Sequence, residues 1–145
     1  MISVYFDNCC YNRPYDDQKQ IKIYLEARAK LHIQRMITEK KLNLVYSFIS
    51  EYENYNNPYD VRKSSINDFF KNASVFVDSS HLEEVTALAA EIEATGVKKM
   101  DAYQVSSAII GKADYFLTTD KRILKYSTEK IQIMNPLDFV RNVEV

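Results

Sequence analysis

Glycine is almost missing from this chain, which has two glycines in 145 residues. Both Gly96 and Gly111 directly follow segments with helical periodicity, where glycine commonly ends a helix. Phosphate-binding loops and dinucleotide-binding motifs need several glycines whose backbone approaches the phosphate groups. We therefore do not expect an enzyme that binds a nucleotide cofactor.

Cysteine and histidine are equally scarce. Cys9 and Cys10 are adjacent, so they cannot join distant segments, and no zinc-ligand spacing accompanies them. We expect reduced, half-buried packing residues; a redox role for the pair is the open alternative. His32 and His81 lie far apart without metalloprotease spacing, and the serines beside His81 suit a helix cap better than a nucleophile.

Long apolar runs are absent too. No segment approaches the ~20 apolar residues of a membrane helix, and the chain enters a strand pattern at once, without a signal-like segment. The mean hydropathy is -0.35. We expect one cytoplasmic domain spanning residues 1–145, with no membrane association.

The chain also has no excess of positive charge. The net charge is -1 and the pI about 6.1, which argues against nucleic-acid binding by bulk charge. A polyanionic substrate would need bound cations and local basic patches. The candidates for such patches are Arg13, Lys98, Lys99, Lys112, Lys121, Arg122 and Lys125.

Strand-like and helix-like segments alternate along the chain. Short β-branched and aromatic runs predict strands at 2–6, 42–46, 74–77, 115–118 and 131–134. Helical periodicity covers 16–41, 61–72, 102–110 and a short segment from Pro136. Ser47 is expected to cap a helix with Phe48, Ile49, Tyr52 and Tyr55 on one face, Ser80 to begin a capping box for a helix ending at Thr95, and Asp101 to cap the 102–110 helix. The alternation predicts βαβ units and a parallel sheet covered by helices.

Four acidic residues accompany this predicted sheet. Asp7 follows the first strand, Asp120 follows the fourth, and Glu53 lies in the helix after the second. Asp101 opens the helix that leads into the fourth strand. Ligands of open parallel sheets bind beyond the carboxyl ends of the strands, and crowded carboxylates repel unless a hard divalent cation lies between them. Each aspartate also suits a helix N-cap, so the pattern alone leaves both interpretations open.

Three motifs carry a resemblance to a known family. They are a hydrophobic strand ending in Asp7 and Asn8, Ser47 followed six residues later by Glu53, and Asp101 with a helix, small residues, a strand and Thr118-x-Asp120. The chain resembles PIN-domain nucleases over essentially its whole length, and most closely the VapC-type toxin ribonucleases of toxin-antitoxin pairs. The first motif reads Asp-Asn-Cys where many members have Asp-x-Asn; Asn12 and Arg13 are nearby substitutes.

The resemblance implies a three-layer αβα sandwich with a central, mainly parallel sheet of about five strands, and one or two Mg²⁺ or Mn²⁺ ions. It implies that Asp7, Asp101 and Asp120 are metal ligands and that Glu53 completes the cluster or positions water in RNA hydrolysis. Thr118 and Asn8 would support the acids, and Arg13 and Lys121 would contact RNA. A cognate antitoxin and a homodimer are the implied partners; 11 Tyr and 7 Phe offer interface material.

Two other functions remain possible. The first is a non-catalytic PIN-fold interaction module, if the acids fail to converge. The second, a phosphatase with an aspartyl nucleophile, needs another acid two residues after Asp7, and Cys9 occupies that position. Glu51 and Glu53 point about 200° apart around a helix, so only one of them can face a metal site. The spacing from Ser47 favours Glu53.

Overall fold

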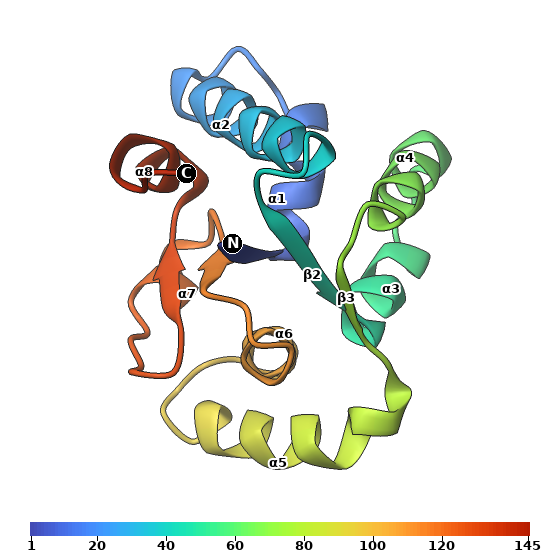
Figure 1. Ribbon diagram of the computed structural model, residues 1–145, viewed down its shortest axis with the longest axis vertical. Helices are drawn as coiled ribbons and strands as arrows, with labels where there is room; N and C mark the ends of the chain where they lie inside the picture. Colours follow the sequence, from blue (N-terminus) through green and yellow to red (C-terminus); the bar gives the residue numbers. More distant parts are fainter.

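A five-stranded parallel sheet forms the centre of the molecule (Figure 1). The computed structural model describes all residues from 1 to 145. The strands are β1 (Ser3–Phe6), β2 (Asn43–Ser47), β3 (Val75–Val77), β4 (Tyr115–Leu117) and β5 (Gln132–Met134), in the spatial order β3-β2-β1-β4-β5. The chain runs outward from β1 in both directions, so the strand order reverses between β1 and β4. In open parallel sheets, ligands bind at such a switch point.

Helices cover both faces of the sheet. They are α1 (Asn8–Asn12), α2 (Ile21–Thr38), α3 (Phe48–Tyr55), α4 (Asp60–Phe70), α5 (Leu82–Glu93), α6 (Lys99–Ile110), α7 (Lys121–Leu124) and α8 (Pro136–Asn142), with short 3-10 turns η1 (Arg13–Tyr15) and η2 (Ser79–His81). Figure 1 shows α2 and α8 on one side of the sheet and α5 and α6 on the other. The predicted αβα arrangement is confirmed. None of these helices combines the length and apolar character that a membrane-spanning segment requires.

The alternation of side chains along β1 builds two separate cores. Val4 and Phe6 pack with residues of α2, α4 and α8, whereas Tyr5 points to the opposite face and packs with residues of α5 and α6. All three side chains are at most 1% exposed. A strand buried on both faces is typical of the centre of a parallel sheet. The position of β1 therefore fixes where Asp7, the next residue, must lie.

Gly111 marks the closest approach of α6 to the sheet. A Cβ atom there would lie 2.5 Å from Val45 Cγ1 and 2.8 Å from Val77 Cγ2. Glycine therefore both ends α6, as predicted, and lets the helix end contact β2 and β3.

Three predicted helix beginnings are wrong. The helix containing Asp101 begins at Lys99 with Lys98 as the N-cap, because Lys98 is still extended and its carbonyl accepts from the Ala102 N–H. Asp101 is thus in the first turn. The 16–41 segment becomes helical only at Ile21, because Gln20 is still extended and Gln18, before it, donates to three carbonyls of the preceding turn. The capping box at Ser80 is replaced by Asp78, which accepts the Ser80 N–H.

The predicted buried face of α3 is wrong in part. Ile49 is buried as expected, but Tyr52 is 56% and Tyr55 73% exposed, and the polar residues Ser50 and Asn54 are buried instead. Polar partners explain the difference: Asn54 donates to the Lys63 carbonyl and to Asn67 of α4, and Ser50 hydrogen-bonds Tyr5 across the sheet edge. A helix that buries polar groups with partners need not bury its aromatic stripe.

One charged residue of α2 is buried among aromatic rings. Lys30 is 5% exposed, its Nζ donates to Gln34 Oε1 at 2.6 Å, and it lies 5.4 to 5.9 Å from the ring centroids of Phe6, Tyr11 and Phe69. Burial lowers the pKa of Lys30 to about 8. At neutral pH the folded protein therefore carries a desolvated ammonium group.

Replacing this group with Lys30→Met should raise the free energy of unfolding by about 2 kcal/mol at pH 7, since the relieved desolvation cost outweighs the lost cation–π contacts and the lost hydrogen bond to Gln34. Because the folded pKa is below the unfolded value of 10.5, the wild type should gain stability relative to the variant as the pH rises above 8. Urea denaturation at pH 7 and 9.5 measures both effects. The exposed Lys22→Met on the same helix is the control, and a Lys30→Met protein less stable than wild type would contradict the prediction.

Candidate active site

Asp7 lies at the carboxyl end of β1, where the strand order reverses. It is the N-cap of α1, with Oδ1 accepting the Asn8 N–H at 2.8 Å, and it is 5% exposed. Burial, and next the nearby Cys9 thiol, raise the pKa of Asp7 well above its usual range, against the hydrogen bond from Thr118. The structure thus holds a carboxylate in an unfavourable environment at the place where a parallel sheet binds ligands.

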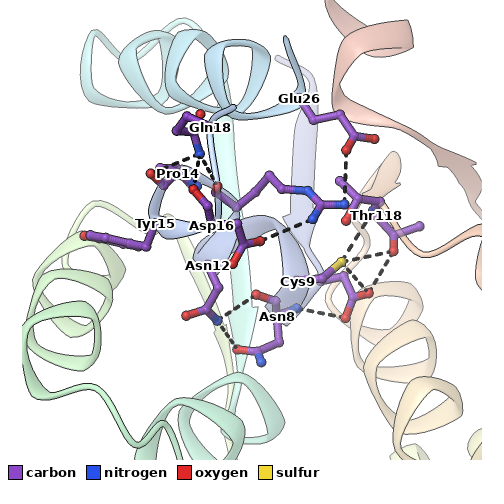
Figure 2. Close-up of polar contacts among 12 residues, drawn as sticks. Asn8, Cys9, Asn12, Pro14, Tyr15, Asp16, Gln18, Glu26 and Thr118 are labelled. Atoms are coloured by element: carbon purple, nitrogen blue, oxygen red, sulfur yellow. Dashed lines mark hydrogen bonds and ion pairs between the residues drawn. The ribbon is translucent and has the colours of Figure 1, made fainter. Parts of the chain in front are cut away.

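Thr118 connects Asp7 to Asp120. Its hydroxyl donates to Asp7 Oδ2 at 2.8 Å and accepts the Asp120 N–H at 3.0 Å. Figure 2 shows Cys9 beside Thr118, and the Cys9 thiol lies 3.3 Å from Asp7 Oδ2. The side chain of Thr118 therefore orients the first acid and the loop that carries the last one.

Glu53 of α3 is held by a buried chain of polar side chains. Gln104 Nε2, on α6, donates to Glu53 Oε1 at 2.6 Å, and the Tyr5 hydroxyl donates to Gln104 Oε1. Tyr5 in turn contacts the hydroxyls of Ser47 at 2.6 Å and Ser50 at 3.0 Å. Burial raises the pKa of Glu53, with Gln104 acting in the opposite direction and Asp101 in the same. Glu51, by contrast, is exposed.

Asp101 and Asp120 approach the same edge from α6 and from the loop after β4. Burial first, and the charge of Asp120 next, raise the pKa of Asp101. Burial also acts to raise the pKa of Asp120, but the Arg122 N–H and guanidinium outweigh it and hold the pKa below its usual range. Asp120 caps α7 and pairs with Arg122 at 3.3 Å. Only this acid has a cationic partner.

The four acids form an electrostatic series rather than a closed cluster. The charge of Glu53 acts to raise the pKa of Asp7. The charge of Asp101 acts in the same way on Glu53, and that of Asp120 on Asp101. No ion pair includes Asp7, Glu53 or Asp101. No three acidic, Cys or His side chains are close enough as they stand to hold a metal ion. The donor set nevertheless fits a hard divalent cation, because uncompensated carboxylate oxygens are the ligands that Mg²⁺ and Mn²⁺ prefer.

Two of the other predicted site residues, Arg13 and Asn8, have structural partners. Arg13 lies 3.2 Å from Asp16 and 3.1 Å from Glu26, linking η1 to α2 (Figure 2). The side-chain amide of Asn12 donates to the backbone carbonyl of Asn8 and to its side-chain oxygen Oδ1. Lys121 is exposed in the first turn of α7. Contacts of Arg13 and Lys121 with RNA remain predictions.

The comparisons with known proteins support the fold. No protein-family model matches the chain, and no curated protein sequence matches it. A chain in the crystal structure of VapBC2 from Rickettsia felis, bound to a DNA fragment from their promoter, superimposes with a TM-score of 0.55. The alignment covers 93% of this chain and 98% of that one at 16% identity. The chain has a PIN-like fold. The family resemblance of the sequence is thus confirmed at the level of the fold.

Sequence reasoning missed Gln104 and Tyr5 in this PIN-like site. Gln104 is fully buried on α6, three residues after Asp101 and hence on the same helix face. That spacing was a usable signal for Gln104. The sequence contains no comparable signal for Tyr5, because a tyrosine within a hydrophobic strand is expected to be an ordinary core residue.

Because Gln104 fixes one oxygen of Glu53, a substitution at position 104 should change the titration of Glu53. In Gln104→Leu, Glu53 loses a hydrogen bond that lowers its pKa, so the pKa of Glu53 should rise and the acidic limb of any pH–rate profile should move to higher pH. We expect kcat to fall about tenfold with KM little changed. Tyr103→Phe, which removes the neighbouring exposed hydroxyl, is the control. An unshifted pH profile would remove Gln104 from this role.

Proposed function

We propose that this protein is a metal-dependent endoribonuclease that hydrolyses RNA phosphodiester bonds. The observation that carries the proposal is the set of three carboxylates with raised pKa and no ion-pair partner, Asp7, Glu53 and Asp101, at the switch-point edge of a PIN-like sheet. Neighbouring ionisable groups whose charged forms are destabilised by burial mark functional sites more often than structural ones.

Asp7, Asp101 and Asp120 would hold Mg²⁺ or Mn²⁺ directly or through water. The bound cation supplies activation of water and neutralisation of phosphate charge. Asp7 is oriented for this role by Thr118 and by the Asn8 N–H. To hold a cation, Asp120 would give up its ion pair with the Arg122 guanidinium. This ion pair is weak because the Arg122 side chain is 64% exposed to solvent.

Glu53 would accept the proton of the attacking water. Gln104 occupies one oxygen, Oε1, which leaves Oε2 free to accept from water. The raised pKa of Glu53 brings its basicity closer to that required near neutral pH. The buried Tyr5–Gln104 chain fixes the carboxylate in place.

The test is cleavage of labelled single-stranded RNA by the purified protein with Mg²⁺, Mn²⁺ or excess chelator. We expect internal cleavage with either cation and none with the chelator. Single-stranded DNA of the same sequence tests for selectivity. Absence of cleavage over a wide Mn²⁺ range, by protein that is shown to be folded, would reject the proposal.

A non-catalytic interaction module is the second candidate. The pairing of Asp120 with Arg122 and the open spacing of the acids favour it. A folded protein that binds RNA but shows no cleavage with any divalent cation is the result expected from this candidate.

We also propose a protein partner, by analogy with the VapBC2 assembly. A cognate antitoxin and a homodimer remain the expected partners. The exposed tyrosines of α3 and the α3–α4 connection, Tyr52, Tyr55 and Tyr59, offer amphipathic surface for either contact. Light scattering at high micromolar concentration should give twice the chain mass of 16.9 kDa, and a monomeric mass would contradict the homodimer.

A further inference from the structure

A basic cavity includes Asp101 in its lining. Its volume is about 430 Å³, and its lining includes Lys98, Asp101, Arg122, Lys125, Tyr126 and Ser127. The segment before α6 and the segment around α7 form its walls. Cavities of this size accommodate small organic groups with a few placed polar contacts.

Positive charge is concentrated here in a chain whose net charge is -1. Three of the lining residues are cations and one is an acid. Lys98 and Lys125 have no ion-pair partner in the structure. The charges of Arg122 and Lys98 both act on Asp101, which places the cationic wall within electrostatic reach of the candidate active site.

The remaining lining matches the other parts of a nucleotide. Tyr126 is half-buried, lines the cavity and packs against the core cluster that contains Ile123, which is 2% exposed. Aromatic rings stack on bases without strong sequence preference. The Ser127 hydroxyl, also in the lining, can bond a sugar hydroxyl, and the Thr95 hydroxyl, which donates to the Ile92 carbonyl, can still accept from one.

We propose that this cavity binds one unpaired nucleotide of the RNA next to the bond that is cut, an inference that rests on the nuclease function proposed above. Lys98 and Lys125 contact the backbone phosphates, and Tyr126 stacks on the base. Since a base must leave a helix to enter the cavity, the protein selects single-stranded RNA over duplex. The cavity thereby holds the chain so that its neighbouring phosphate lies at Asp101.

Binding without catalysis tests this assignment. The affinity of an eight-nucleotide fluorescent single-stranded RNA is measured by anisotropy at several salt concentrations, in excess chelator so that metal-dependent cleavage cannot occur. Lys98→Ala with Lys125→Ala should weaken binding about tenfold or more and reduce the slope of log Kd against log salt by about 1.4, the value for two lost phosphate contacts on a single strand. Tyr126→Leu, which keeps apolar volume but removes the ring face, should weaken binding about tenfold with an unchanged slope.

The matched control removes two lysines from the opposite edge of the sheet. Lys41 and Lys71 precede β2 and β3, and their side chains are 64% and 80% exposed. The doubly substituted Lys41→Ala, Lys71→Ala protein has the same net charge as the cavity variant and should bind like wild type. Equal affinity and slope in the two double variants would overturn the inference. Equal affinity for duplex and single strand, or no measurable binding by the wild type, would overturn it as well.

The outcomes separate this inference from the function on which it rests. Wild-type cleavage with unchanged KM in the cavity variants would reject the cavity and leave the nuclease function standing. Loss of binding in the cavity variants of a protein that never cleaves RNA would reject the nuclease function and support the cavity as an RNA-binding site.

Discussion

Asp7→Asn and Asp101→Asn should each reduce RNA cleavage at least about a hundredfold while the fold remains intact. An amide keeps the volume of the carboxylate but loses the charge that holds a divalent cation, and metal interactions contribute several kcal/mol to such reactions. Asparagine is also a good N-cap, so the start of α1 should be preserved. Cleavage rates at saturating Mn²⁺ and circular dichroism of both variants provide the measurement.

Thermal stability gives a second readout that does not depend on activity. Because the folded pKa of Asp7 lies above the unfolded value of 3.8, the ionised carboxylate opposes folding at neutral pH. Metal-free Asp7→Asn should therefore melt at a higher temperature than wild type near pH 7. The difference should shrink as the pH falls toward 4, where the unfolded acid also becomes protonated.

Added Mn²⁺ should reverse this order. A ligand that binds only the folded state stabilises it by about 2.7 kcal/mol at a concentration of a hundred times Kd, so Mn²⁺ should raise the melting temperature of wild type and leave that of Asp7→Asn unchanged. Full Mn²⁺-dependent cleavage by both asparagine variants, with the same Mn²⁺ shift as wild type, would exclude a metal site at these acids.

Glu53→Gln should lose at least about a hundredfold in kcat, and Glu51→Gln should stay within about twofold of wild type. The two residues form a matched pair, since both substitutions remove one negative charge from α3. Glu53 is half-buried and bonded to Gln104, whereas Glu51 is exposed beside Tyr52. A group that takes a proton in the reaction contributes about 10² to 10⁴ in rate, and an exposed charge outside the site contributes little.

Measuring RNA cleavage for both variants across a Mn²⁺ titration decides between two roles of Glu53. A defect that excess Mn²⁺ repairs indicates that Glu53 helps to hold the cation, whereas a defect in kcat at all concentrations indicates proton transfer. If Glu51→Gln were the inactive variant, the alignment of Glu53 with the second family motif would be wrong.

The sequence predicted the sheet and most helices because hydrophobic periodicity is local. Val4, Tyr5 and Phe6 form a run that has to be buried on both faces, and this alone identifies a central strand of a parallel sheet. Pro136 likewise marks the expected start of a short helix, and α8 begins there; that Asn135 caps it is seen only in the structure. The carboxyl-edge positions of Asp7 and Asp120 follow from the same strand boundaries.

Helix boundaries and helix faces depended on partners that are distant in the sequence. Asp101 has good capping chemistry, yet α6 begins at Lys99, three residues before the expected Ala102, so Asp101 lies in the first turn and does not cap the helix. The polar face of α3 turned inward because Tyr5, Lys63 and Asn67 supply its hydrogen bonds. No local pattern contains those partners.

The sequence by itself determined the order of strands and helices along the chain and the positions of Asp7 and Asp120 directly after strands, since both follow from periodicity and chain connectivity. Only the tertiary structure decided which glutamate faces inward, that Gln104 and Tyr5 hold it, and that Lys98 and Lys125 share one cavity with Tyr126. These facts require residues about fifty to a hundred positions apart in the sequence, such as Glu53, Gln104 and Tyr5, to be within hydrogen-bond distance. Hydrophobic periodicity shows which residues are buried but not which residues they contact. The chemistry of the site therefore arises from the packing of α3 and α6 against β1.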